Sequence, residues 1–233
     1  MAPEHGRAEQ LMILLHGLGS NGQAMAPLAQ QLRQAFPQAL LVAPDGFDGF
    51  DGSGNGRQWF SMQGLTDANR AERVAAVLPR LGDLVRATQA STGLSQPATA
   101  LVGFSQGAIL ALELAGLHDG LAGRVLAFSG RYAVLPEFAP SQTTLHLFHG
   151  ADDAVIPVAH ARATIGRLAE LGGDATIDIA AGVGHEMAPA LIGCALQRLR
   201  THIPQRTWAE AMGATPRFAK SAGEADGHGA DGH

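Results

Sequence analysis

The sequence lacks several features that would assign it to other classes of protein. Lys and Arg number only 16 against 21 Asp and Glu, for a formal net charge of −5, and no basic cluster offers a phosphate-binding face. We therefore expect no nucleic-acid partner. The apolar run nearest the start, residues 11–15, is far shorter than the roughly 20 residues of a membrane span and shorter than the apolar core of a signal peptide, so we expect neither. The single cysteine, Cys194, cannot form an internal disulfide, which favours a cytoplasmic location.

The sequence does contain enough apolar residues for one sizeable core. Its 233 residues are 46% hydrophobic and 16% charged, which suits a single domain. Short continuous apolar runs, typical of strands buried on both faces, alternate with longer segments of helical spacing. The runs lie at residues 11–15, 39–43, 99–104, 125–128, 145–148 and 177–181. We predict an α/β fold whose mostly parallel sheet has about six or seven strands, with helices on both faces.

Three other segments lead to more local predictions. An apolar stripe from Val74 to Val85 indicates a helix, which Pro79 should kink because proline lacks the amide hydrogen. The Gly- and Asp-rich residues 46–56 predict a mobile loop. From Gln205 onward the apolar periodicity fails, and the last residues are of low complexity. We therefore predict one domain over residues 1–204 and a largely disordered C-terminal tail over residues 205–233.

The chemistry should lie where the apolar runs end, because ligand sites in parallel sheets gather beyond the carboxyl ends of the strands. One run leads into Gly103-Phe104-Ser105-Gln106-Gly107, a G-x-S-x-G pentad followed by an apolar helix. A serine at such a sharp strand-to-helix turn presents its hydroxyl above the sheet. The start of the helix also leaves the Gln106 amide unpaired and able to bind a negative oxygen. Ser105 is therefore the candidate nucleophile.

A serine hydroxyl needs an adjacent base, and that base needs a carboxylate to fix its tautomer. His185 follows the last apolar run in a Gly-x-Gly-His turn, where it could reach the serine. His16 and His149 each precede a glycine and resemble turn residues that pack their rings, whereas His160 is expected on a helix surface. Asp152 and Asp153 both follow the run at residues 145–148, and strand-end geometry does not separate them.

Taken together, these motifs resemble the carboxylesterase and acyl-protein-thioesterase branch of the α/β-hydrolases, particularly the small bacterial esterases. The resemblance covers about residues 11 to 199. Five segments carry it: residues 15–19 (Leu-His-Gly-Leu-Gly), 59–60 (Trp-Phe), 103–107, 149–157 (His-Gly-Ala-Asp-Asp-Ala-Val-Ile-Pro) and 184–186 (Gly-His-Glu). It implies an α/β-hydrolase fold, and the ten residues before Leu11 are too few for the two leading antiparallel strands of the larger fold. Between the runs at residues 125–128 and 145–148 there is too little chain for a cap domain.

The resemblance also implies roles for particular residues. The family pattern H-G-x-x-D-x-x-x-P places the catalytic carboxylate on Asp153. The family's oxyanion hole falls on the backbone amides of Leu18 and Gln106. Trp59 and Phe60 match an aromatic pair beside the acyl site, which is the interpretation we favour, although two aromatics after a Gly-rich loop could also belong to the core. The implied reaction is hydrolysis of small acyl esters or thioesters, with no metal and no cofactor, by a monomer or homodimer.

Two other functions fit parts of the sequence. Gly17, Gly19 and Gly22 form a G-x-G-x-x-G after a strand, with Asp45 at the end of the next strand, as in dinucleotide-binding proteins. Pro27, however, suits a first helical turn, so the helix would start too late to direct its dipole at a pyrophosphate. This reading also leaves Ser105, Asp153 and His185 unexplained. The second alternative is a catalytically idle hydrolase-fold protein that binds a partner.

Overall fold

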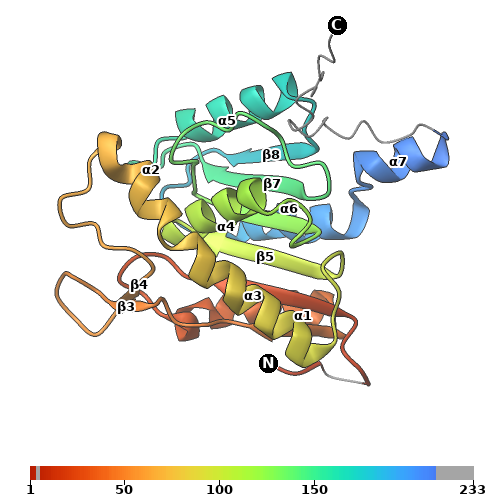
Figure 1. Ribbon diagram of the computed structural model, residues 1–233. Coiled ribbons are helices and arrows are strands. Elements are labelled where there is room, and N and C mark those ends of the chain that lie inside the picture. Colours follow the sequence, from red (N-terminus) through yellow and green to blue (C-terminus); the bar gives the residue numbers. More distant parts are fainter. Residues whose placement is uncertain (4–5, 214–233) are drawn as a thin grey trace, which may run out of the picture. The chain divides into compact units, whose positions relative to one another are not determined.

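The computed structural model describes residues 1–3 and 6–213, and its centre is a six-stranded parallel sheet. The strands of this sheet are β1 (Gln10–Leu15), β2 (Ala39–Val42), β5 (Thr99–Phe104), β6 (Arg124–Phe128), β7 (Thr144–Gly150) and β8 (Ala175–Ala180). Their order is β2-β1-β5-β6-β7-β8, and every neighbouring pair is parallel. Figure 1 shows the strands side by side. The predicted α/β architecture is confirmed, with six strands.

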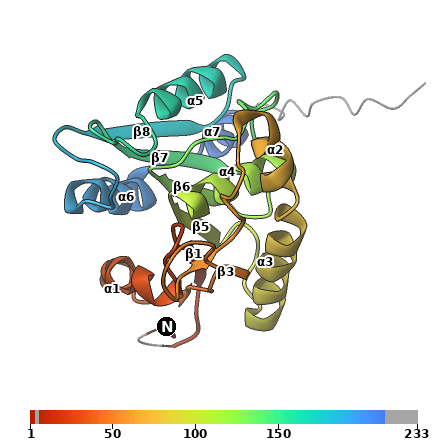
Figure 2. The same cartoon turned by 90° about the vertical axis from the view of Figure 1, so that its left-hand side faces the viewer.

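The helices lie on both faces of this sheet, as predicted. They are α1 (Ala26–Ala35), α2 (Asp67–Ala75), α3 (Leu78–Thr92), α4 (Gln106–Leu117), α5 (Ala159–Glu170) and α6 (Pro189–Thr201), with a short 3-10 helix, η1, at Gly22–Met25. Figure 2 shows α1 and α6 on one side of the strands and α3 and α4 on the other. Two apolar clusters fill the two interfaces, one containing Leu28 of α1 and Leu191 of α6, the other containing Leu81 of α3 and Leu112 of α4.

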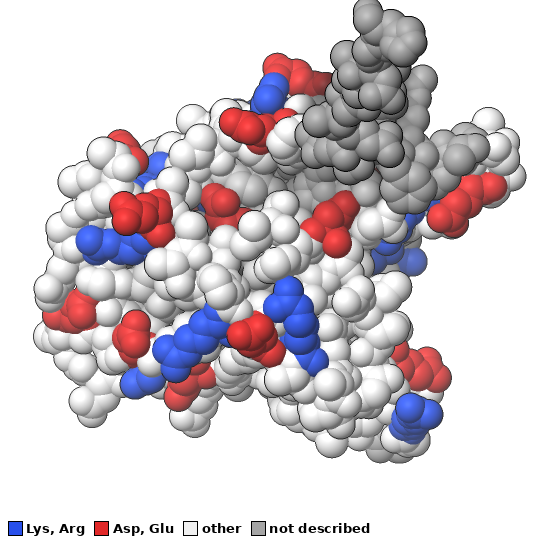
Figure 3. Space-filling model, in the orientation of Figure 1, with Lys and Arg blue, Asp and Glu red and all other residues white. Residues whose placement is uncertain are grey.

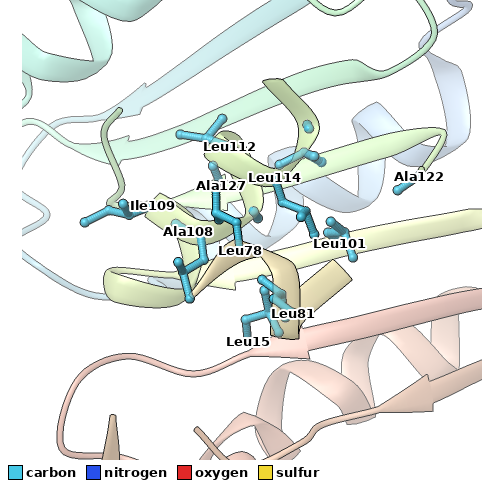
Figure 4. Packing of buried hydrophobic residues seen from close by; sticks show 14 of the residues in the cluster. Leu15, Leu78, Leu81, Leu101, Ala108, Ile109, Leu112, Leu114, Ala122 and Ala127 are labelled. Atoms are coloured by element: carbon cyan, nitrogen blue, oxygen red, sulfur yellow. The ribbon is translucent and has the colours of Figure 1, made fainter. Parts of the chain in front are cut away.

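The strands are buried because apolar residues occupy consecutive positions, so both faces of each strand can pack against helices. In β7 all seven residues are buried. Figure 4 shows one of the interfaces, where Leu15 of β1 lies close to Leu81 of α3, and Ala127 of β6 lies near Ala108 of α4. Helix α4 also packs against β1 and β5, and Ser105 lies where β5 leads into α4.

Pro79 does not kink a helix as we predicted; it marks a boundary between two. α2 ends at Ala75 and α3 begins at Leu78, so the proline lies in the first turn of α3. An amide hydrogen at that position would have no partner within the helix, so proline is tolerated there without loss of a hydrogen bond. The same rule explains Pro27 in the first turn of α1, where we expected it.

The Gly-rich loop at residues 46–56 makes more hydrogen bonds than its composition indicated. Strands β3 (Asp48–Gly49) and β4 (Arg57–Gln58) form a small antiparallel pair that joins its two ends. The guanidinium group of Arg57 also donates hydrogen bonds to the carbonyls of Gly46 and Phe47, at 3.0 Å each. The prediction of a mobile loop took no account of this pairing, because neither strand has an apolar pattern.

The chain divides into two compact units, Met1–His202 and Ile203–His233. The second contains a helix, α7 (Gln205–Ala211), where we expected a tail without regular structure. Its residues have good helix propensity, which apolar periodicity does not measure. The rest of the predicted tail, from residue 214, lies outside the described residues.

The site is not covered by an extra domain within the described part of the first unit. Residues 129–143, between β6 and β7, contain neither helix nor strand, in agreement with the expectation of no cap. Among the helices of residues 1–3 and 6–213, none has both the length and the apolar character that crossing a membrane would require.

A buried histidine, His146, links three neighbouring strands, β6, β7 and β8. His146 of β7 is fully buried; Arg124 of β6 donates to its Nε2 at 3.1 Å, and its Nδ1 donates to the hydroxyl of Thr176 in β8 at 2.8 Å. This pattern requires the neutral imidazole, because a second proton would face the guanidinium group. Burial, followed by the charge of Arg124, lowers the pKa of His146 to about 3 from the usual 6.5.

We expect His146 to make folding stability depend on pH. Between pH 6.5 and about 3, His146 is protonated in the unfolded chain and neutral in the folded chain. The free energy of unfolding therefore has its full value above pH 6.5 and falls on acidification, by up to about 1.4 kcal/mol per pH unit. Urea unfolding from pH 8 to pH 5 should show His146→Gln losing less stability than the unmodified chain over this range, even if it starts lower. Equal losses in both proteins would contradict this assignment.

Candidate active site

Ser105 occupies the turn between β5 and α4 in a strained backbone conformation. Its φ is 52° and its ψ is −115°, outside the regions that residues with a Cβ normally adopt. The turn is held by hydrogen bonds on both sides: the Ser105 amide donates to the carbonyl of Phe128 at 2.9 Å, and the Ala108 and Ile109 amides donate to the Ser105 carbonyl at 3.0 Å. Such a turn presents the serine hydroxyl beyond the end of the sheet.

The two flanking glycines are required by close packing of backbone. A Cβ on Gly103 would collide with the carbonyl of Gly107, and a Cβ on Gly107 would collide with the carbonyl of Leu15 at the end of β1. Any side chain at either position would therefore push α4 away from the sheet. The G-x-S-x-G pattern in this chain is a packing requirement of the turn that carries Ser105.

His185 and Asp153 lie next to this serine, although 80 and 32 residues separate the paired positions along the chain. The Nε2 atom of His185 is 2.9 Å from Ser105 Oγ, and its Nδ1 is 2.7 Å from Asp153 Oδ2. A carboxylate accepts only, so Nδ1 carries the proton and Nε2 is left to accept the serine hydroxyl. The ring of Phe104 packs against the imidazole, with centroids 5.1 Å apart.

The structure distinguishes the two aspartates that the sequence left open. Asp153 is buried, and its Oδ1 accepts hydrogen bonds from the amides of Val155 at 2.9 Å and Ile156 at 2.8 Å. Burial acts to raise the pKa of Asp153, but the hydrogen bonds from His185, Ile156 and Val155 outweigh it and hold the pKa below its usual value. Asp152 is exposed. Asp153 is therefore the ionised carboxylate that contacts His185.

A second histidine contacts the same carboxylate, a contact that the sequence did not indicate. His149, at the end of β7, is buried, and its Nε2 donates to the carbonyl of Ile156 at 2.7 Å and lies 3.3 Å from Asp153 Oδ2. We expected a turn residue that packs its ring. Its ring also fixes residues 153–156, whose backbone amides hold the aspartate.

The predicted oxyanion donors are at the start of α4 and in the loop after β1, and both lie beside Ser105. Gln106 is the first residue of α4, so its amide has no carbonyl one turn back within the helix. Leu18, in the loop after β1, lines both cavities that adjoin Ser105. Both residues thus lie in the immediate surroundings of the serine, as the resemblance implied.

Trp59 and Phe60, the predicted aromatic pair, differ in their position relative to the cavities at Ser105. The amide of Trp59 donates to Gln106 Oε1, and Gln106 Nε2 donates to the carbonyl of Phe60, both at 2.8 Å. Trp59 is fully buried, its indole donates to the His16 carbonyl at 2.9 Å, and it lines neither cavity at Ser105. The expectation that Trp59 contacts substrate therefore needs correction to a core position. Phe60 does line one of the cavities.

The glycines of the alternative dinucleotide motif have structural explanations. The amide of Gly22 donates to Asp45 Oδ1 at 2.8 Å, and a Cβ on Gly22 would collide with the backbone of Ala43. Gly19 has a φ of +71°. Only η1 follows the loop directly, and α1 begins at Ala26, so no long helix starts at the position that a pyrophosphate would need.

Two cavities adjoin Ser105. The larger, about 420 Å³, contains His185, Met25 and Met187 and is called here the His185 cavity. The smaller, about 270 Å³, contains Arg70, Arg131 and His160 and is called the arginine cavity.

The apolar wall of the arginine cavity consists of Phe60, Met62, Ile109, Val155, Ile156 and Pro157. Sequence reasoning missed the three polar residues. Arg131 does follow a predicted strand end, but His160 was expected on a helix surface and Arg70 has no distinguishing pattern. Within the described residues, no group of three or more His, Cys, Asp or Glu is arranged to hold a metal ion.

Comparison with known proteins places this geometry in a family. The model of the phospholipase/carboxylesterase family matches residues 1–203. The chain is 46% identical over 207 residues to the esterase YpfH of Escherichia coli (strain K12), covering 88% of each chain. It is 28% identical over 163 residues to acyl-protein thioesterase 1 of Yarrowia lipolytica (strain CLIB 122 / E 150), covering 62% of this chain and 70% of the relative.

Among solved structures, esterase PE8 superimposes with a TM-score of 0.78 at 31% identity, covering 86% of this chain and 95% of its own. The chain therefore belongs to the phospholipase/carboxylesterase family of the α/β-hydrolase fold and is a carboxylic ester hydrolase.

Proposed function

We propose that this hydrolase cleaves small acyl esters and thioesters through Ser105, His185 and Asp153, by way of an acyl-enzyme. The observation that supports this most is the continuous hydrogen-bonded chain from Ser105 Oγ through His185 to Asp153, with distances of 2.9 and 2.7 Å. A catalytically idle hydrolase-fold protein would not require a strained serine aligned with an oriented base.

In the first half of the reaction, Ser105 Oγ attacks the acyl carbon while His185 Nε2 takes its proton. The carbonyl oxygen becomes negative and is bound by the amides of Leu18 and Gln106. Preorganised donors of this kind are typically worth about 2.7–4 kcal/mol each in barrier height. Asp153 stabilises the imidazolium that forms, without taking its proton.

In the second half, His185 gives the proton to the departing alcohol or thiol, and a water molecule takes the place of the leaving group. The water attacks the acyl-enzyme with His185 again as base, which releases the carboxylic acid and restores the serine. The same machinery serves esters and thioesters, because only the leaving atom differs. Because residues 129–143 form no cap domain, substrate reaches the serine directly.

We also propose a cytoplasmic location for the enzyme. The support is Cys194, the single thiol of the chain, which is half-buried in α6 and forms no disulfide. A reducing compartment leaves such a thiol unmodified.

Replacing the nucleophile should abolish turnover without unfolding the chain. We expect Ser105→Ala to reduce hydrolysis of 4-nitrophenyl acetate by at least roughly 10⁴-fold, because the serine and its base act as a unit. A fluorophosphonate probe, followed by mass spectrometry, should label Ser105 in the unmodified chain only. Ser91→Ala, at an exposed serine of α3, is the matched control and should keep full activity. Full activity in Ser105→Ala would end the proposal.

The two neighbouring aspartates should differ strongly. Asp153→Asn removes the acceptor that fixes the His185 tautomer, and a loss of roughly 10⁴-fold in kcat is expected with KM little changed. Asp152→Asn, one residue away on the exposed side, should stay within about threefold of the unmodified chain. Steady-state kinetics at pH 8 measure both. A larger loss in Asp152→Asn than in Asp153→Asn would overturn the assignment.

A further inference from the structure

The two cavities at Ser105 can be assigned to the two parts of the substrate, if the proposed function holds. His185 must protonate the leaving group, so the alcohol or thiol belongs in the His185 cavity. The acyl chain then extends in the other direction, into the arginine cavity, which contains Leu18 and Gln106 but not His185. The residues of that cavity therefore determine which acyl groups are accepted.

The arginine cavity combines an apolar wall with an excess of positive charge. The side chains of Arg70 and Arg131 are only 19% and 18% exposed. The carboxylate paired with both is Asp67, 3.2 Å from Arg70 and 3.8 Å from Arg131, and its side chain is 88% exposed. A carboxylate so exposed is well screened by water and compensates little of the charge of two partly buried cations. On the face drawn in Figure 3, acidic and basic side chains lie interspersed.

The pKa shifts in the arginine cavity are consistent with this excess of positive charge. Burial, and after it the charge of Arg70, lowers the pKa of Arg131, yet a guanidinium group keeps its proton in proteins. Burial and the charge of Arg131 likewise lower the pKa of His160, which favours a neutral ring there. The cavity thus holds two permanent cations that disfavour each other.

Both arginines have hydrogen-bonding capacity left over. Arg131 is oriented by bonds from its Nε to the Tyr132 carbonyl at 3.2 Å and from its Nη1 to His160 Nε2 at 3.1 Å. Its Nη2 is 3.8 Å from Asp67, beyond hydrogen-bonding distance. Arg70 Nε is buried and has no hydrogen-bond partner among the described residues. A buried donor without a partner is costly, and an anionic ligand would supply acceptors.

We propose that the acyl group of the preferred substrate ends in a carboxylate, so that the enzyme hydrolyses half-esters or half-thioesters of short dicarboxylic acids. The apolar wall contacts the methylene chain, and Arg70 and Arg131 bind the terminal carboxylate. A planar carboxylate matches the fork of an arginine and forms charge-assisted hydrogen bonds with it. This inference rests on the proposed function, and it names the substrate class of the same site.

The experiment compares two substrates that differ only at the far end of the acyl chain. One is the mono-4-nitrophenyl ester of adipic acid, and the other has a neutral carboxamide in place of its free carboxylate. We expect the unmodified enzyme to prefer the acid by about ten- to hundredfold in kcat/KM, the range for hydrogen bonds between charged groups. A ratio near one, or a preference for the amide, would overturn the inference.

Variants test whether the arginines cause the preference. Arg131→Gln and Arg70→Gln should each lower the acid-to-amide ratio at least fivefold, and the double variant should bring it close to one. Arg86→Gln is the control: it removes one positive charge from a more exposed arginine of α3, which is paired with Asp83, and should leave the ratio unchanged. A ratio that persists in the double variant would refute the role of these residues.

A second substrate pair tests the direction of binding. In 4-carboxyphenyl hexanoate the carboxylate is on the leaving group, and 4-carbamoylphenyl hexanoate is its neutral partner. We expect no preference here that depends on Arg70 or Arg131; such a preference would overturn the placement of the acyl chain in the arginine cavity.

Should an arginine variant fail to fold, inhibition of the unmodified enzyme gives an independent test. Adipate should inhibit more strongly than its monoamide, and equal inhibition would contradict the inference. Failure of the proposed function is distinguishable, because the enzyme would then hydrolyse neither adipic ester and Ser105 would not react with a fluorophosphonate. Hydrolysis of both at equal rates would leave that function intact and remove only the inference.

Discussion

Close packing of the turn at residues 103–107 against the end of β1 is the constraint on which the site depends. Side chains at Gly103 or Gly107 would separate α4 from the sheet. The turn forces Ser105 to a φ of 52°, a conformation that costs of the order of 1–3 kcal/mol. Three backbone hydrogen bonds and the burial of α4 hold it there. As a result the serine hydroxyl and the first amide of α4 are fixed in place before substrate arrives.

Gln106 extends this rigidity to the surrounding loops. Its side chain satisfies the Trp59 amide and the Phe60 carbonyl, two buried backbone groups that would each cost about 1–3 kcal/mol if left unpaired. Trp59 in turn donates to the His16 carbonyl in the loop that carries Leu18. Gln106 thus connects the turn of Ser105 to Trp59 and Phe60, and Trp59 connects these residues to the loop after β1. Such preorganisation is what allows donors to stabilise a developing charge without rearrangement.

The sequence predicted the strands well, and Ser105 and His185 could be proposed from it, because each rests on a strong local pattern. Consecutive apolar residues mark a strand buried on both faces, and the strand ends bring Ser105 and His185 to one edge. Asp152 and Asp153 could not be separated from the residues alone, since the turn conformation decides which side chain faces inward. Trp59 and Phe60 are both aromatic, and only the fold distinguishes them, because Phe60 lines the arginine cavity and Trp59 does not. His160 lies near the start of α5, outside the buried face of Ala161, Thr164 and Leu168, so periodicity placed it on the surface.

The proposed role of the arginine cavity is a way for an α/β-hydrolase without a cap domain to select its substrate. Selectivity that a cap would supply by shape must here come from side chains at the edge of the sheet. Arg70 and Arg131 come from α2 and from the loop after β6, and in the absence of ligand they repel each other. Their side chains are only 19% and 18% exposed, and burying charges that are only partly compensated opposes folding. In the substrate class that we propose, an anionic acyl chain relieves that repulsion, which favours binding of the anion over a neutral chain of the same length.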